Sequence, residues 1–468
     1  MKNRIWYYVL PFFGMVFGVW YLKNSFVDVV YSDYIRLVNS YLPDVWNPDK
    51  FFVGDVLTRI PLNYLARIIN TTFFDYRIRF DQALGILSLG LSSMLLISYC
   101  IRKDIGILWY LCLMAVTFSL NKWEMMVNGS GWIHFFAFAC FYYHYLVLER
   151  IWTGREKKGD RIRLLVLPWF ITLGVAGPYC AVYSLTLVLT YGFGFFLTWK
   201  RDKRWEKSYI VWGISAVIPL CLYIWSNARA AEGQVGSLGA SFVSGLLENP
   251  GYMIRFFIKS FASMIIGIEC AHAKFTSNLP YLSLGLLIMA GYGLALWFQF
   301  RRQLYEETLF PLILTVSGIL NHLLIWYSRW GFLDEDYGMA SRYALQFQIG
   351  IFGMLLTFAL VRQKIRAERQ KKNEGTKPGS VLSQTLMAAV VLAVVVGNGY
   401  TTREELKKAP ARKYSCMFRA ELARDFENRT DEELSQHFEY WTGSIEGGQA
   451  VRAALEILKE QKWNVFRE

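Results

Sequence analysis

The chain has 468 residues, of which 54% are hydrophobic and 17% are aromatic, yet its formal net charge is +13. Only 19% of the residues are charged, against about 25% in an average soluble domain. This composition excludes a disordered chain, a disulfide-rich scaffold and an ordinary soluble enzyme. The positive charge fits either a basic surface for nucleic acid or the uneven loop charge of a membrane protein, and its distribution decides between them.

Eleven apolar stretches approach the length of about 20 residues that a helix needs to cross a membrane. Gly177 and Pro178 divide one long apolar run into two of these stretches. A further apolar piece, 251–270, carries Arg255 and Lys259 near its start, and we interpret it as an interfacial or re-entrant helix. The sequence therefore predicts an all-α polytopic membrane protein. In chain order the predicted spans are 5–22, 82–101, 105–120, 132–148, 164–178, 179–198, 208–226, 281–300, 308–327, 343–361 and 382–399.

The segments that connect these spans alternate in charge. The set that begins with the N-terminus holds nearly all of the excess Lys and Arg, whereas the other set is close to neutral. Cytoplasmic loops are the ones enriched in Lys and Arg. We therefore expect a multi-pass plasma-membrane protein with a cytoplasmic N-terminus and a C-terminal tail outside. The same segregation argues against a nucleic-acid partner and makes membrane lipids the expected surroundings.

The charge pattern also predicts the domain organisation. A transmembrane body covers residues 1–361, and a charged cytoplasmic linker follows at 362–381. The last transmembrane helix is expected at 382–399. The polar residues 400–468 are expected to form a small helical tail on the outer face.

Two outer loops of the body, 23–81 and 227–280, are long. In the first, the stretch 53–70 has apolar residues three and four apart, with Arg59 and Arg67 on another face, which predicts an amphipathic helix in the membrane interface. The second begins with a Gly- and Ala-rich segment. That segment would serve either as a lid beside an active site or as a plain flexible connector.

Acidic residues in the outer loops are candidates for catalysis. Asp33, in the string YSDYIR, follows the first span, where a carboxylate could deprotonate an acceptor hydroxyl or hold a divalent ion. Glu124 lies in an apolar setting beside Trp123 in the next outer loop. Asp28 is a weaker, supporting candidate. Arg36 falls on the same helical face as Asp33, so the alternative role of Asp33 is a structural ion pair.

Four further residues are candidates for binding phosphate. Arg342 and Tyr343, in the string SRY, stand at the outer end of the tenth predicted span, and an arginine there can bind a phosphate through two N–H groups. Interfacial anchoring is the alternative for this pair. Arg255 and Lys259 are four residues apart and share one helical face, so they would either clamp a diphosphate or contact lipid headgroups.

The order of these features resembles the GT-C class of membrane glycosyltransferases. The resemblance covers residues 1–361: YSDYIR is similar to the first acidic motif of the class, WEM to its second acidic position, and SRY to its donor-phosphate segment. It implies a GT-C-like fold with Asp33 and Glu124 in catalytic roles, and with a divalent Mg or Mn ion that both could hold. Many members have two adjacent acids in the first loop, whereas this chain has Ser32 before Asp33.

The resemblance also implies a function. The chain would be a hexosyltransferase-type enzyme that moves a sugar from a polyprenyl-phosphate carrier to a glycan or lipid acceptor of the cell envelope on the outer face. Two alternatives stay open at this point, a polysaccharide polymerase or ligase acting on lipid-linked glycans and a transporter or flippase. The acid in the long first loop argues against the former, and the lack of visible two-half symmetry argues against the latter.

Overall fold

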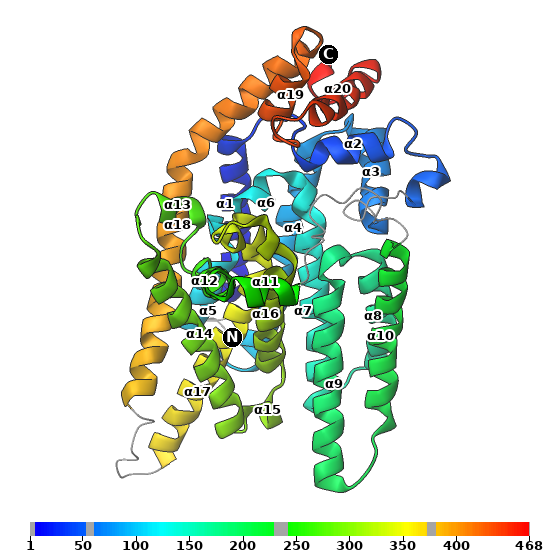
Figure 1. The fold of residues 1–468 in the computed structure, drawn as a ribbon. Coiled ribbons are helices and arrows are strands. Elements are labelled where there is room, and N and C mark those ends of the chain that lie inside the picture. Colours follow the sequence, from blue (N-terminus) through cyan, green and yellow to red (C-terminus); the bar gives the residue numbers. More distant parts are fainter. Residues whose placement is uncertain (1–4, 53–59, 229–241, 372–380, 468) are drawn as a thin grey trace.

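The computed structural model describes residues 5–52, 60–228, 242–371 and 381–467. Throughout this part of the chain the regular secondary structure is helical, and it contains no strand. Long helices form a bundle, and shorter helices gather at one of its ends together with the C-terminal residues (Figure 1). The predicted all-α architecture is confirmed for the residues described.

Nine helices within the described residues are long and apolar enough to cross a membrane, judged by length and composition. A helix suits this environment because it satisfies its own backbone N–H and C=O groups where no water is present. The chain is therefore a polytopic membrane protein. The nine helices are α1 (Ile5–Ser25), α4 (Ile78–Arg102), α7 (Trp132–Trp152), α9 (Cys180–Asp202), α10 (Lys207–Ala228), α14 (Asn278–Arg301), α16 (Phe310–Arg329), α17 (Ala344–Lys371) and α18 (Val381–Arg424).

Two predicted spans form helices that are not among these nine. The third predicted span corresponds to α5 (Ile107–Thr117), with 11 residues, and the fifth to α8 (Asp160–Gly174), with 15 residues. At 1.5 Å per residue, α5 covers about 17 Å, roughly half of a hydrocarbon core. The piece 251–270 is divided between α12 (Pro250–Ala262) and α13 (Ile268–His272), so it forms no single membrane-length helix.

The long helices differ in how much surface they bury. In α17, 94% of the most apolar stretch is buried, so this helix lies in the centre of the bundle, whereas the corresponding share is 22% in α1 and in α10. Glycines let α16 and α17 approach closely, because a Cβ at Gly318 would collide with the backbone of Gly350. The exposed apolar faces of the outer helices are the surface that lipid would cover.

One end of the bundle, here named the capped end, is covered by α2 (Asp33–Tyr41), α3 (Pro61–Phe74), α19 (Asp431–His437) and α20 (Ile445–Glu460) (Figure 1). This arrangement joins the first loop of the chain to its last residues. The capped end holds the predicted outer loops, so the topology prediction places it outside the cell. The remaining short helices are α6 (Trp123–Val127), α11 (Phe242–Glu248) and α15 (Leu304–Glu307).

Helix α3 contains most of the described part of the predicted amphipathic stretch 53–70, of which 53–59 lie outside the described residues. Its polar side chains, among them Asn63 and Arg67, are buried against the protein, while Leu65 and Phe73 are exposed. The apolar face therefore points outward, as an interfacial helix requires. Most of the Gly-rich segment proposed as a lid also falls outside the described residues, which resume at 242.

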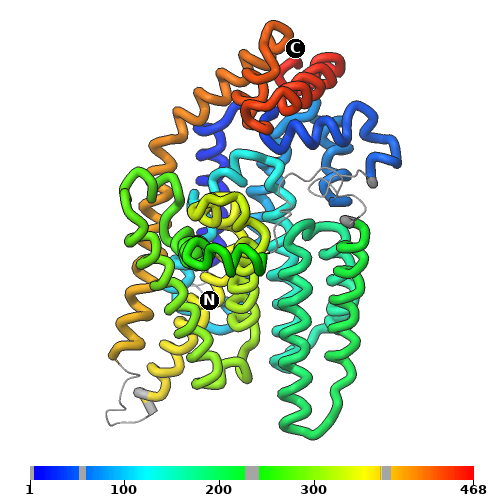
Figure 2. The backbone as a smooth tube through the Cα atoms, viewed as in Figure 1, coloured from blue at the N-terminus to red at the C-terminus, as the bar shows by residue number. Residues whose placement is uncertain are grey.

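The predicted last span and the start of the predicted tail form one continuous helix, α18, of 44 residues. Figure 2 shows α18 running along the side of the bundle up to the capped end, where the C-terminal helices lie against the first loop. Its second half carries the charged residues expected of the tail. The tail is thus a rigid extension of a membrane-length helix. Most of the predicted linker after 371 lies outside the described residues.

Candidate functional site

Asp33 is the first residue of α2, at the capped end, and its side chain is exposed. The preceding residue, Ser32, has a φ of 52°, a conformation that non-glycine residues rarely adopt. The Ser32 N–H donates to the Phe438 carbonyl oxygen at 2.8 Å, so a contact from the C-terminal tail holds the chain at this turn. A carboxylate in the first turn of a helix is also favoured by the helix dipole.

A buried polar cluster fixes α2 to the bundle. The hydroxyl of Tyr34 donates to Asp81 Oδ2 in α4 at 2.5 Å, and Arg67 from α3 pairs with the other carboxylate oxygen. All three side chains are fully buried. Because Tyr34 is the neighbour of Asp33, this cluster determines where the Asp33 carboxylate lies.

Glu124 and Arg342 form an ion pair. Glu124 belongs to the short helix α6, and Arg342 lies in the single turn Ser341–Tyr343 that leads into α17. Arg342 Nη2 is 3.1 Å from Glu124 Oε1, and the hydroxyl of Ser341 donates to Glu124 Oε2 at 2.9 Å. Both charged side chains stay partly accessible, with 46% of Arg342 and 30% of Glu124 exposed. The Asp33 carboxylate exerts a weak electrostatic effect on Arg342. The structure thus joins Glu124 and Arg342 in direct contact and places Asp33 in the same region of the molecule.

Asp28 occupies a different position. Its Oδ1 accepts a hydrogen bond from the backbone N–H of Ile78 at 2.8 Å and one from Asn464 Nδ2 at 3.3 Å. Burial raises the pKa of this carboxyl group. These bonds join the start of α4 to the C-terminal segment, so they give Asp28 a structural role. Arg36 lies nearly one turn beyond Asp33 on α2 and is half-buried.

Arg255 and Lys259 point toward an acidic pair between α16 and α17. Arg255 Nε donates to Glu335 Oε1 at 2.7 Å, and Lys259 Nζ donates to Glu335 Oε2 at 3.0 Å and to Asp336 Oδ1 at 2.8 Å. Burial alone would raise the pKa of Glu335, but the bonds from Arg255 and Lys259 outweigh it and hold that pKa below its ordinary value. His272 also contacts Asp336, at 2.9 Å. The charges of both cations are therefore balanced by carboxylates.

A second ion-pair cluster lies beside Glu124 and was not identified from the sequence. The guanidinium of Arg412, in α18, stacks on the ring of Trp123, with Cζ 3.1 Å from the ring centre. The same guanidinium bonds Glu269 Oε2 at 2.7 Å and Glu405 Oε2 at 2.9 Å, and Tyr21 donates to Glu405 Oε1 at 2.8 Å. Since Trp123 precedes Glu124, α18 supports the helix that carries the candidate acid. The seven-residue spacing of Glu405 and Arg412, which places them on one face of a helix, is the feature of the sequence that could have indicated their contact.

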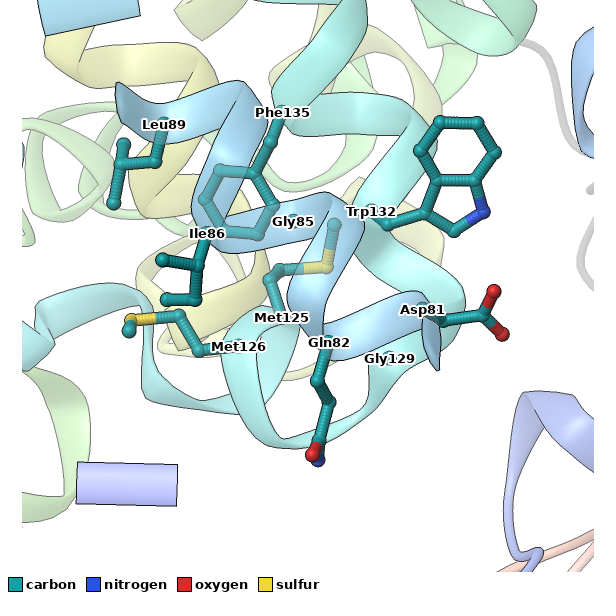
Figure 3. A pocket seen from close by; sticks show the side chains of 10 residues that line it. All are labelled: Asp81, Gln82, Gly85, Ile86, Leu89, Met125, Met126, Gly129, Trp132 and Phe135. Atoms are coloured by element: carbon teal, nitrogen blue, oxygen red, sulfur yellow. The ribbon is translucent and has the colours of Figure 1, made fainter. Parts of the chain in front are cut away.

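Figure 3 shows a small cleft between α4, α6 and α7. Its lining is mainly apolar, and the carboxylate of Asp81 is directed away from Ile86, Met126 and Phe135 (Figure 3). The lining residues are Asp81, Gln82, Gly85, Ile86, Leu89, Met125, Met126, Gly129, Trp132 and Phe135.

A metal site was tested by the spacing of possible ligands. Among the residues that the structure describes, no group of three His, Cys, Asp or Glu side chains could hold a metal ion. Glu124 already accepts from a guanidinium and a hydroxyl. Asp33 and Glu124 alone supply few of the oxygen ligands that Mg²⁺ takes. The Mg or Mn ion remains a prediction.

Comparison with known proteins gives no relative from which a function could be transferred. No protein-family model, no characterised protein and no solved structure matches the chain.

Proposed function

We propose that the protein is a GT-C-like membrane glycosyltransferase, which moves a sugar from a polyprenyl-phosphate carrier to a glycan or lipid acceptor of the cell envelope. The observation that supports this proposal is the partly accessible Glu124–Arg342 ion pair, on which the exposed Asp33 carboxylate exerts a weak electrostatic effect. An accessible carboxylate beside an accessible guanidinium supplies a base for an acceptor and a cation for a leaving phosphate. The capped end is the outer side in the predicted topology.

The reaction follows from these two groups. The Asp33 carboxylate accepts the proton of an acceptor hydroxyl while the acceptor oxygen attacks the anomeric carbon of the sugar. The bond between that carbon and the phosphate oxygen breaks, and polyprenyl phosphate leaves with the electron pair. Arg342 stabilises the charge that develops on this phosphate. Glu124 orients Arg342 through their ion pair, and no step is assigned to a metal ion.

Arg255 and Lys259 have a weaker case as phosphate ligands in this proposal. Both are held by Glu335, and Lys259 is held by Asp336 as well. A phosphate would have to displace these carboxylates, and Lys259 is only 2% exposed. Arg342 and Arg255 each have one acidic partner in the described chain and are 46% and 41% exposed, and Arg342 is the proposed ligand because its partner is the candidate acid Glu124.

The test is sugar transfer by the full chain in proteoliposomes, with a panel of polyprenyl-phosphate hexoses labelled in the sugar. Asp33→Asn removes the base and keeps the size of the side chain, so we expect transfer to fall at least about 100-fold. Asp49→Asn is the matched control, because Asp49 is an exposed acid in the same loop, and we expect no change. Full activity of a correctly folded Asp33→Asn protein would refute the base assignment. Absence of transfer by the wild type from the whole panel would favour a transporter or flippase.

A further inference from the structure

Arg329 differs from the three candidate phosphate-binding cations in whether an acid neutralises its charge. Arg255, Lys259 and Arg342 all form ion pairs with carboxylates. Arg329, the last residue of α16, does not: within the described chain no group accepts a hydrogen bond from it, and its Nε atom is buried without a partner. The side chain is half-buried. Arg329 therefore carries a positive charge that no described carboxylate balances.

Aromatic side chains surround this charge. The Cζ atom of Arg329 lies 5.7 Å from the centre of the Phe332 ring. The ring centre of Tyr343, a 7% exposed residue of the turn before α17, lies 6.1 Å from that of Tyr337. Tyr343 therefore belongs to the group of aromatic rings that lies beside Arg329.

The same group of rings connects Arg329 to Arg342. Phe332 stacks on Tyr337 with ring centres 4.4 Å apart, and Arg342 Cζ lies 5.9 Å from the Tyr337 ring centre. Each ring of the stacked pair therefore has a guanidinium over it. Arg329 is thus linked through two stacked rings to Arg342, the proposed phosphate ligand.

A half-buried guanidinium without an acid loses part of its hydration and gains no ion pair in return. An anion with several oxygens compensates this loss, because guanidinium and phenol groups both donate hydrogen bonds and phosphate accepts them. We propose that Arg329, with the hydroxyl of Tyr343, binds the phosphate of a phosphate ester. This inference deepens the proposed function. The phosphate site itself is argued from the contacts of Arg329, and only the identification of the phosphate as that of a lipid carrier rests on the proposed function.

The surroundings favour a phosphate that is attached to a lipid. Tyr327 is 65% exposed, Leu333 is 78% exposed and Phe332 is 41% exposed. Apolar side chains thus stay accessible on both sides of Arg329 in the sequence, at the end of a membrane-length helix. A ligand with an alkyl chain would cover them, whereas free phosphate would not.

Binding is tested by titration calorimetry on the full chain in detergent, with three probes: a C20 polyprenyl monophosphate, the C20 polyprenol and inorganic phosphate. Loss of a charge-assisted hydrogen-bonding group predicts that Arg329→Gln weakens binding of the polyprenyl phosphate by about 10- to 100-fold. Arg302→Gln is the matched control. Arg302 also follows the end of a membrane-length helix and is 28% exposed, but it pairs with Glu368 at the opposite end of the bundle. We expect this control to bind as the wild type does, and the polyprenol to bind weakly to all three proteins.

An Arg329→Gln protein with wild-type affinity for the polyprenyl phosphate would overturn the inference and leave sugar transfer by Asp33 untouched. Conversely, a failed Asp33 test does not affect this inference, because binding requires no transfer. Equal affinities for inorganic phosphate and the lipid, both lost in Arg329→Gln, would support the phosphate site and overturn its lipid source. If Arg329→Gln aggregates, Tyr343→Phe removes one hydroxyl and keeps the ring, and unchanged affinity of that variant would overturn the inference as well.

Discussion

The buried pair of Arg67 and Asp81 provides a sharp test of how the capped end is built. Replacement of Arg67 by Met keeps much of the side-chain volume and removes the charge. Asp81 then keeps the hydroxyl of Tyr34 as a partner but loses its cation while its side chain is 0% exposed. Removal of one partner from a buried ion pair typically costs about 3–5 kcal/mol. We therefore expect Arg67→Met to lose that much free energy of unfolding.

The assay is denaturant unfolding of the full chain in detergent micelles, followed by far-ultraviolet circular dichroism. Arg161→Met is the matched control, because Arg161 pairs with Glu156 at 2.9 Å, but the two side chains are 65% and 37% exposed. Exposed pairs contribute about 0–1 kcal/mol. A second variant, Arg67→Met with Asp81→Asn, should recover part of the loss because it removes the unpaired charge.

The reasoning would be refuted by an Arg67→Met protein as stable as the Arg161→Met control. It would also be refuted if the addition of Asp81→Asn to Arg67→Met lowered the free energy of unfolding further, as an independent second substitution would. In either case burial of the charge would not be what makes the cluster important, and the placement of α2 would depend on its apolar contacts.

Two further predictions concern stability. The pKa values of Glu335 and Asp336 are lowered in the folded protein, so their ion pairs stabilise it above the unfolded values, near pH 4, and this contribution is lost as the pH falls through the lowered values. Thermal unfolding should show wild type more stable than Glu335→Gln at pH 7, with a difference that shrinks as the pH falls below about 4, and a constant difference would contradict this. Gly318→Ala places a Cβ against the backbone of Gly350, so it should lower the free energy of unfolding by about 1–3 kcal/mol. Gly293→Ala is the control, because open space surrounds Gly293, and it should not lower the stability. Equal effects of the two substitutions would show that α16 and α17 can separate freely.

The long helices were predictable because a membrane crossing requires length and apolarity, which are local properties of the sequence. Hydropathy also marks the apolar stretches of α5 and α8, but it does not report the residues at which their helices begin and end. The predicted boundary between the last span and the tail at 399 is absent for a similar reason. Polar residues after Gly399 continue the helix of α18, since polarity does not by itself end a helix.

The sequence names the members of the candidate site but not their pairings. It places Arg342 at the outer end of a predicted span and Arg255 and Lys259 in a predicted interfacial or re-entrant helix, but ion pairs depend on segments that are far apart in the chain. Lys259 meets Asp336 across 77 residues, and Glu124 meets Ser341 across 217. Arg329 stood out in the sequence only as a charge after a span. Its lack of a carboxylate partner becomes visible once the neighbours are known.

The C-terminal tail takes part in building the site. The Ser32 N–H bonds the Phe438 carbonyl at the turn before Asp33, and Asn39, on the same helix, donates to the Ala450 carbonyl at 2.9 Å. Ordering the long first outer loop, 23–81, costs conformational entropy, which contacts with the tail help to offset. The contacts from the tail reduce the number of conformations that α2 can adopt, so they hold the candidate base near Arg342. The tail therefore acts as a scaffold for the first outer loop.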